Sequence, residues 1–253
     1  MKKISLLISY LIPVIIRNFF FKLFALSIGK GFDHGSLQKE FDFIKKFLGK
    51  KVNILIDIGS NKGAYSDVFL KNYPNSNIYI FEPQKYLYEK LLVKYSNNKN
   101  IKIFNCAIDE EEKEANLYKS FDGDGEGSIY KRKYIKNEKN LKEVIKCKRL
   151  DEVLNIDRNQ IIDFVKIDVE GNEIKTLRGS EKIIYQIKVL QIEFGGTWID
   201  SRYFYRDLYE FFKAKNFKLY RMSPNSLIEI KEYDETDEYF SFTNFIAVNN
   251  GIK

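Results

Sequence analysis

The sequence predicts an α/β fold in which a mostly parallel sheet carries helices on both faces. Three observations lead to this prediction. From Val52 onward, short apolar runs alternate with helical patterns, which is typical of parallel strands joined by crossover helices. A glycine-containing turn, Gly59 to Gly63, joins the first apolar run to the first helix. An acidic residue, Glu82, directly follows the second apolar run.

The expected elements follow from these patterns in chain order. Parallel strands are predicted at residues 53–58, 77–81, 101–104, 162–167 and 188–194, and helices at residues 64–72, 84–95 and 203–215. Two further strands, at residues 218–222 and 242–248, predict an antiparallel hairpin at the edge of the sheet.

The domain organisation predicted from the sequence is one main domain, residues 49–253, after an apolar and basic helical segment, residues 1–48. The interval between the third and fourth strands is too long for one crossover helix, which indicates an insertion at about residues 109–150. Within it we expect strands at residues 116–119 and 144–149, and a helix beginning at residue 151. The loop FDGDGEGS, residues 121–128, is interpreted either as a lid over a substrate or as an ordinary surface loop.

The charge of the chain is concentrated at its N-terminus. Lys and Arg number 42 against 35 Asp and Glu, a net charge of +7, and residues 1–30 supply five of these basic residues and no acid. Only +2 remains for the other 223 residues, so the basic balance says little about nucleic acid and more about the N-terminal segment, and no nucleic-acid partner is predicted. The two cysteines are too few for a disulfide scaffold or a zinc site, which favours a cytoplasmic protein.

The run from Ile4 to Ile28 is strongly apolar, but Pro13, Arg17, Asn18 and Lys22 interrupt it. Three interpretations stay open: peripheral contact with the inner face of a membrane, packing against the domain, and a true span. No small-residue cleavage site follows the segment, so export is not predicted.

The first strand, the turn and the second strand together predict a nucleotide site. A helix that begins after a strand directs free N–H groups at an anion, and an acidic residue at the tip of the next strand accepts hydrogen bonds from ribose hydroxyls. The turn G-S-N-K-G has Ser60 and Asn61 where a dinucleotide pyrophosphate needs a middle glycine. A ligand with an amino-acid carboxylate, S-adenosylmethionine, therefore fits better, with its adenine near residues 105–108. Three roles are expected for Asp57: it accepts hydrogen bonds from the amides of the turn, it accepts a hydrogen bond from the ligand's ammonium group, or it only caps the turn.

A second group of candidates lies in IDFVKIDVEGNEIKTLRG, residues 162–179. Lys166, Asp168 and Glu170 alternate by two, so an extended chain places them on one side. Three charges in a buried strand are costly unless they line a cleft or pair with one another. A cleft is the expected arrangement, and a structural ion pair is the alternative.

These motifs resemble the FkbM family of S-adenosylmethionine-dependent methyltransferases. The resemblance rests on DIGSNKGAYS (57–66), FEP (81–83), LDEVL (150–154), DFVKIDVEGNEIKTLRG (163–179) and QIEF (191–194). It implies a Rossmann-like methyltransferase fold with a seven-stranded sheet, and O-methylation of a hydroxyl group on a sugar, glycan or other small molecule. It also implies a cofactor site, for which we predict Asp57, Gly59, Ser60, Asn61, Gly63, Tyr65, Glu82, Pro83, Ala107 and Asp168.

For the reaction, the first candidate for the base is Asp168, followed by Glu170 and Lys166. A divalent metal held by Asp168 and Glu170 is conceivable, but two carboxylates are too few to predict a metal site. Two other functions stay open: an NAD-dependent oxidoreductase, and a non-catalytic, membrane-associated module that binds an anionic glycan.

Overall fold

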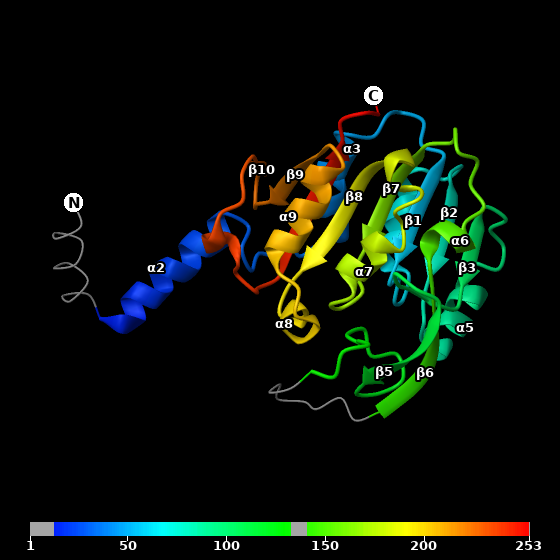
Figure 1. Cartoon of the computed structure of the whole chain (residues 1–253), viewed down its shortest axis with the longest axis horizontal. Coiled ribbons are helices and arrows are strands. Elements are labelled where there is room, and N and C mark those ends of the chain that lie inside the picture. The colour runs from blue at the N-terminus through cyan, green and yellow to red at the C-terminus, as the bar shows by residue number, and fades with distance from the viewer. Residues whose placement is uncertain (1–12, 133–140, 253) are drawn as a thin grey trace.

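The computed structural model describes residues 13–132 and 141–252, and at its centre is an eight-stranded sheet of order β10-β9-β11-β8-β7-β1-β2-β3 (Figure 1). The five parallel strands are β3 (Ile101–Phe104), β2 (Asn77–Phe81), β1 (Ile54–Ile58), β7 (Ile162–Ile167) and β8 (Ile187–Phe194). The antiparallel strands are β11 (Thr243–Asn249), β9 (Phe217–Met222) and β10 (Leu227–Ile230). The predicted fold class, a mostly parallel α/β sheet, is confirmed.

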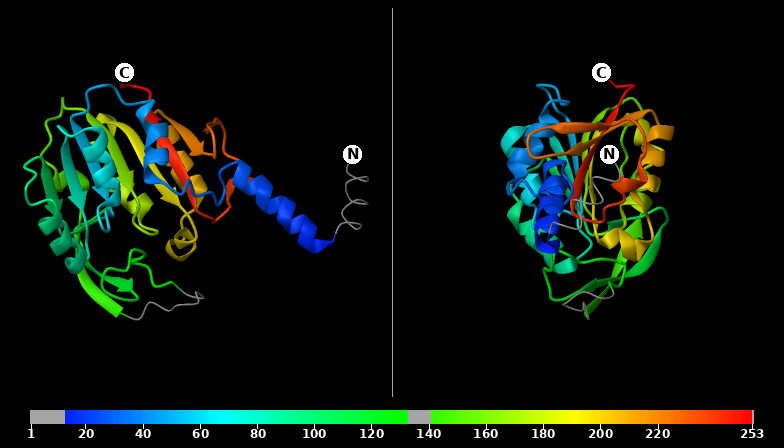
Figure 2. Two further views of the ribbon diagram at one scale, coloured as in Figure 1. Left: turned by 180° about the vertical axis from the view of Figure 1, so that it is seen from behind. Right: turned by 90° about the vertical axis from the view of Figure 1, so that its left-hand side faces the viewer.

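Helices cover both faces of the sheet (Figure 2). Leu55 and Phe164 pack toward one group of helices, while Ile56 and Val165 pack toward the other, because successive side chains of a strand point to opposite faces. The first group is α3 (Leu37–Lys45), α4 (Ala64–Asn72) and α5 (Lys85–Lys94), and the second is α6 (Leu150–Val153), α7 (Glu173–Arg178), α8 (Thr197–Ser201) and α9 (Tyr205–Ala214). Short 3₁₀ helices η1 (Ile184–Gln186) and η2 (Glu235–Asp237) complete the connections.

The order of the strands reverses between β1 and β7. The chain proceeds from β1 through β2 to β3 at one edge, and then returns to β7 on the other side of β1. In an open α/β sheet, the crevice outside the carboxyl ends of the strands at such a reversal is the usual place for a ligand. The fold therefore indicates a ligand site at the carboxyl ends of β1 and β7.

The insertion builds a second, three-stranded sheet of order β4-β6-β5, which lies beyond the carboxyl ends of the large sheet (Figure 1). Its strands are β4 (Ala107–Ile108), β5 (Lys113–Lys119) and β6 (Leu141–Lys148). Both strands predicted within the insertion are confirmed, although each begins three residues before its predicted start. The loop after β5 is closed by an antiparallel bridge between Tyr118 and Ser128.

The main difference from the predicted sheet is β10, which makes eight strands where seven were expected. It pairs antiparallel with β9 and forms the hairpin at the sheet edge. β11 lies between β8 and β9 and is antiparallel to both, so the predicted antiparallel pairing of the last two strands is confirmed but the edge position belongs to β10. The short run of β10 is only partly buried, which gives it a weak apolar signal.

The described N-terminal residues behave in two ways. α2 (Val14–Ser27) projects from the body of the protein, as Figure 2 shows, and its contacts are near its C-terminal end. α3, in contrast, buries Phe41 and Ile44 completely in the core. Residues 1–12 of the predicted segment lie outside the described residues. Within the described part of the chain, no helix has both the length and the apolar character needed to cross a membrane.

Candidate functional site

The turn after β1 is held tightly between the ends of two strands. The N–H groups of Gly59 and Ser60 donate to the carbonyl oxygen of Phe81, at 3.0 and 3.2 Å. Gly59 has a φ of +79°, and a Cβ at this position would lie 1.8 Å from the carbonyl oxygen of Asp168. Only glycine therefore fits where the chain leaves β1 beside β7.

Gly63 ends the turn and begins α4. Its φ is +72°, and its carbonyl oxygen accepts a hydrogen bond of 2.8 Å from Tyr95 Oη. A Cβ at Gly63 would lie 2.6 Å from that same hydroxyl. The two glycines of the motif thus allow close packing of protein against protein, and α4 begins directly after the turn with its free N–H groups.

Glu82 joins the end of β2 to this turn. Its carboxylate accepts hydrogen bonds from the N–H of Asn61 at 2.8 Å and from the N–H of Gln84 at 2.9 Å. Burial raises the pKa of Glu82 to about 8, although the two N–H groups oppose the shift. Each carboxylate oxygen has a second lone pair, so Glu82 retains the capacity to accept hydrogen bonds from a ligand.

Asp57 is buried beneath the turn and does not bond the turn's amides, one of the roles expected for it. Its Oδ2 accepts a hydrogen bond of 2.6 Å from Ser66 Oγ of α4, and within the described residues its Oδ1 has no partner. Burial raises the pKa of Asp57, and the positive charge of Lys166 opposes this shift. Asp57 therefore fixes α4 against β1.

Lys166 and Asp168 form an ion pair of 2.7 Å at the end of β7. The Lys166 side chain is buried, with its ammonium group 5.1 Å from the centre of the Tyr65 ring, whereas Asp168 is 28% exposed. Burial lowers the pKa of Lys166, but the negative charges of Asp168, Asp57 and Glu193 outweigh it and raise the pKa above its ordinary value. A lysine held in the charged form has no lone pair to accept a proton, so it is a poor base.

The alternation predicted for the three charges ends after Asp168. β7 stops at Ile167, and Glu170 has a φ of +54°, so the chain has already left the extended conformation. Glu170 therefore occupies a turn, where its carbonyl oxygen accepts a hydrogen bond of 2.6 Å from Ser128 Oγ.

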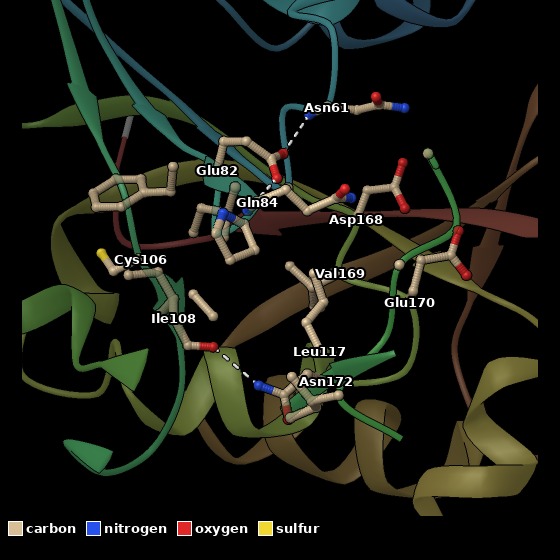
Figure 3. Close-up of a pocket in the computed structure, with 18 residues that line it drawn as sticks. Asn61, Glu82, Gln84, Cys106, Ile108, Leu117, Asp168, Val169, Glu170 and Asn172 are labelled. Carbon is tan, nitrogen blue, oxygen red and sulfur yellow. Dashed lines mark hydrogen bonds between the residues drawn. The ribbon is translucent and has the colours of Figure 1, made fainter. Parts of the chain in front are cut away.

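These segments line a cavity, shown in Figure 3, whose empty space of about 560 Å³ includes space open to solvent. Predicted site residues that line the cavity are Gly59, Asn61, Glu82, Pro83, Ala107, Asp168 and Glu170. Predicted residues that support it without lining it are Asp57, Ser60, Gly63, Tyr65 and Lys166.

The loop of residues 121–130 closes one side of this cavity. The carbonyl oxygen of Asp124 accepts a hydrogen bond of 2.7 Å from Gln84 Nε2. Tyr130 Oη donates a hydrogen bond of 3.2 Å to Asn172 Oδ1. A Cβ at Gly125 would lie 2.4 Å from Asn61 Nδ2. The loop therefore lies against the glycine turn, the residues after β2 and the turn after β7.

Sequence reasoning missed several residues of the cavity. Gln84 and Asn172 both line the cavity. Gln84 directly follows the FEP motif, and Asn172 lies within the VEGNE segment. Glu193, which does not line the cavity but whose charge acts on Lys166, was also missed. Burial and the charge of Asp168 raise its pKa well above its ordinary value. The signal for Glu193 was its place in QIEF at the end of β8. Among the described residues, no cluster of three His, Cys, Asp or Glu side chains is placed to hold a metal ion.

The sequence matches the Methyltransferase FkbM domain family over residues 57–219, well over half of the chain. This chain belongs to the FkbM methyltransferase family. Its fold is the Rossmann-like methyltransferase fold, and the predicted family is confirmed. No curated relative matches the sequence.

Three solved structures resemble the FkbM chain in fold at low identity. An rRNA methylase from Streptococcus thermophilus has 12% identity and a TM-score of 0.47, with 83% of this chain and 94% of that chain covered. A protein from Streptococcus mutans assigned as a methyltransferase, in complex with SAH, has 12% identity and a TM-score of 0.47, with 84% and 96% covered. A protein from Staphylococcus aureus assigned as a caffeoyl-CoA O-methyltransferase has 10% identity and a TM-score of 0.48, with 98% of each chain covered.

Proposed function

We propose that this methyltransferase uses S-adenosylmethionine to methylate a hydroxyl group on a sugar, glycan or other small molecule. The observation that carries the proposal is the cavity at the strand reversal, where Glu82 from β2 and Asp168 from β7 face the same space. A carboxylate after the second strand suits ribose hydroxyls, and a carboxylate after β7 suits a proton acceptor. Neither carboxylate is suited to bind the pyrophosphate of NAD, and the turn lacks the middle glycine that allows a pyrophosphate to approach the backbone.

Unpaired buried acceptors support the fit of the cofactor. Asn61 and Gln84 line the cavity, and their Oδ1 and Oε1 atoms are buried; no side chain or backbone group within residues 13–132 and 141–252 forms a hydrogen bond with these two atoms. A buried polar atom without a partner costs about 1–3 kcal/mol, so natural proteins rarely retain several in one place. Hydroxyl, amino and ammonium donors of an adenosyl amino acid would satisfy these atoms.

The residues divide between two ends of the cavity. Gly59, Asn61 and Glu82 would hold the amino-acid and ribose parts of the cofactor, while Pro83 and Ala107 would border its adenine. S-adenosylmethionine, when bound, supplies a methyl group that the positive sulfur has already activated. The chain's own task is then to orient the acceptor hydroxyl and remove its proton, and correct orientation can contribute about 7–11 kcal/mol.

Asp168 is the residue that we propose as the base. Its pairing with buried Lys166 holds the carboxylate in one orientation at the cavity wall. A positioned base contributes about 10²- to 10⁴-fold to rate. Glu170 also lines the cavity and is the second candidate.

The test begins with cofactor binding, measured by calorimetry with S-adenosylhomocysteine. Tight binding with one site per chain supports the proposal, and NADH serves as the negative control. Absence of binding at millimolar concentration would overturn the cofactor assignment.

The acceptor is tested with isotopically labelled S-adenosylmethionine. Cell-envelope glycans, small metabolites and total RNA are each incubated with the protein, and mass spectrometry locates the labelled methyl group. Label on a sugar or metabolite oxygen supports the proposal. Label confined to RNA, or to nitrogen, would replace it with another acceptor class.

A further inference from the structure

α2 exposes a large apolar surface. Its eight bulky apolar side chains with exposures between 44% and 83% are Val14, Ile15, Ile16, Phe19, Phe20, Phe21, Leu23 and Phe24. Contiguous apolar surface of this kind is rare on a soluble monomer and marks an interaction site. The cavity does not involve this helix, so the methyltransferase site does not explain the exposure.

Six of these eight apolar side chains gather on one side of the helix, whereas Val14 and Phe21 lie on the other side. At about 100° per residue, Ile15, Phe19, Leu23, Ile16, Phe20 and Phe24 occupy an arc of about 180°. Arg17 and Lys22 flank this arc, one at each border, and Asn18 lies between them on the opposite side. Basic side chains at both borders of an apolar arc can extend their charged ends to lipid headgroups while the arc enters the acyl region.

The rest of the protein leaves this arc open. Two residues of α2 that contact the body are Ala25, which is 3% exposed, and Phe21, whose ring centre lies 6.0 Å from that of Tyr239. On the helix, these two residues lie about 180° from the centre of the apolar arc. The helix therefore projects from the body (Figures 1 and 2), and the apolar arc lies opposite these two contacts.

The charge around α2 has one sign. Residues 1–32 contain five basic residues and no acid. Of these, Lys30 is already paired with Asp237 at 3.0 Å, while Arg17 and Lys22 on the helix are exposed. An apolar arc bordered only by cations complements a surface with apolar interior and negative headgroups, and each Lys or Arg near such a surface adds to binding.

We propose that α2 docks this protein on the surface of an anionic lipid bilayer, with its apolar arc in the headgroup and acyl boundary. This places the methyltransferase body against the membrane and favours acceptors that are presented at that surface. The inference does not depend on the identity of the acceptor.

The experiment is co-sedimentation of the full chain with phosphatidylglycerol–phosphatidylcholine vesicles and with pure phosphatidylcholine vesicles. We expect strong binding to the anionic vesicles and weak binding to the neutral ones. The double variant Phe20→Glu/Phe24→Glu should lose binding to both. Arg17→Gln/Lys22→Gln should weaken binding to anionic vesicles roughly 30-fold, since two basic residues are removed.

The matched control is Val93→Glu, because Val93 is 77% exposed on α5 and lies outside α2. Its binding to vesicles should equal that of the unmodified chain. Calorimetry with S-adenosylhomocysteine on every variant checks that the fold and the cavity are unchanged, which separates failure of this inference from failure of the proposed function.

Three outcomes would overturn the inference. The first is binding that the Phe20→Glu/Phe24→Glu variant retains. The second is a dimer in light scattering that this variant converts to a monomer, without vesicle binding, since α2 would then pair two copies. The third is sedimented protein that alkaline carbonate cannot extract, since that would indicate an integral segment.

Discussion

The ammonium group of Lys166 lies 2.7 Å from Oδ2 of Asp168, with the lysine buried and the aspartate at the cavity wall. The two residues are separated by one position at the end of β7, where both side chains point toward the same face of the sheet. The carboxylate of Asp168 therefore lines the cavity, and the positive charge that balances it belongs to the buried side chain of Lys166. The charge of Lys166 thus has a structural role at the end of a buried strand.

The first prediction concerns Asp168→Asn. The amide keeps the shape of the side chain but cannot accept a proton from the acceptor hydroxyl. We expect turnover with an identified acceptor to fall by about 10²- to 10⁴-fold, with S-adenosylhomocysteine affinity unchanged in calorimetry. Unchanged turnover would remove Asp168 from the reaction, and Glu170→Gln is then the next variant to measure.

The second prediction concerns Lys166→Met, which keeps the length of the side chain and removes its charge. Removing one partner of a buried pair leaves an uncompensated charge, and we expect a loss of about 3 kcal/mol, the lower end of the usual range, because Asp168 is partly exposed. For a chain of this size this corresponds to a fall in Tm of roughly 6–12 °C. Lys85→Met is the control, because Lys85 is 75% exposed and its 3.9 Å pair with Glu89 contributes little. Equal Tm values for both variants would contradict a structural role for the Lys166 charge.

The third prediction concerns Glu82 and pH. With its pKa raised to about 8, Glu82 is largely protonated in the free protein at neutral pH. Ribose hydroxyls donate more strongly to the ionised form, so cofactor binding should release a proton below pH 8. We expect affinity to rise with pH up to about 8 and then level off, and calorimetry in buffers of different ionisation enthalpy measures the proton.

The matched variant Glu82→Gln should bind the cofactor more weakly and lose this pH dependence. Glu89→Gln, an exposed change on α5, should retain it. A pH profile that Glu82→Gln leaves intact would show that another group titrates, and Glu82 would lose its assigned place beside the ribose.

Much of the fold could be predicted because the signals are local. The runs that became β2, β3 and β7, and the helix α4, have the predicted bounds, since each is a short apolar or periodic segment between turn residues. Gly59 and Glu82 could be located for the same reason, because their meaning follows from their position at the ends of strands.

What could not be predicted depends on pairings that are distant in sequence. Glu40 of α3 accepts a hydrogen bond of 3.1 Å from Gln191 of β8, and Gln191 in turn accepts one from Tyr65 of α4. Gln191 lies 151 positions from Glu40 and 126 positions from Tyr65, and no local periodicity connects it with either residue. Asp57 differs in this respect, because its partner Ser66 is only nine positions away but belongs to the helix rather than to the turn.

The fourth prediction compares two glycines that share a positive φ. Gly59 has a φ of +79° and faces the carbonyl oxygen of Asp168, whereas Gly35 has a φ of +64° with no atom within 4 Å of a built Cβ. Gly35→Ala should cost about 1–2 kcal/mol for its backbone conformation alone. Gly59→Ala adds a collision with the backbone, so it should cost several kcal/mol or prevent folding. Urea unfolding measures both, and similar losses would mean that the ends of β1 and β7 can separate freely.

The fifth prediction concerns stability and the buried carboxyl group of Glu173. This carboxyl accepts hydrogen bonds from the N–H groups of Val169 and Gly171, and burial raises its pKa from an ordinary 4.5 to about 8. Between these values the folded state holds the proton more tightly than the unfolded state does. The contribution to stability is therefore complete below about pH 4.5 and is lost as the pH rises to about 8.

Glu173→Gln removes this titration while it retains an acceptor for the two N–H groups. We expect the free energy of unfolding of the unmodified chain to fall more steeply between pH 5 and pH 8 than that of the variant, in urea titrations at each pH. Glu173 does not line the cavity, so ligand affinity should not follow the same profile. Parallel profiles for the two proteins would mean that the carboxyl is ionised in the folded state, and that the turn after β7 tolerates a buried negative charge.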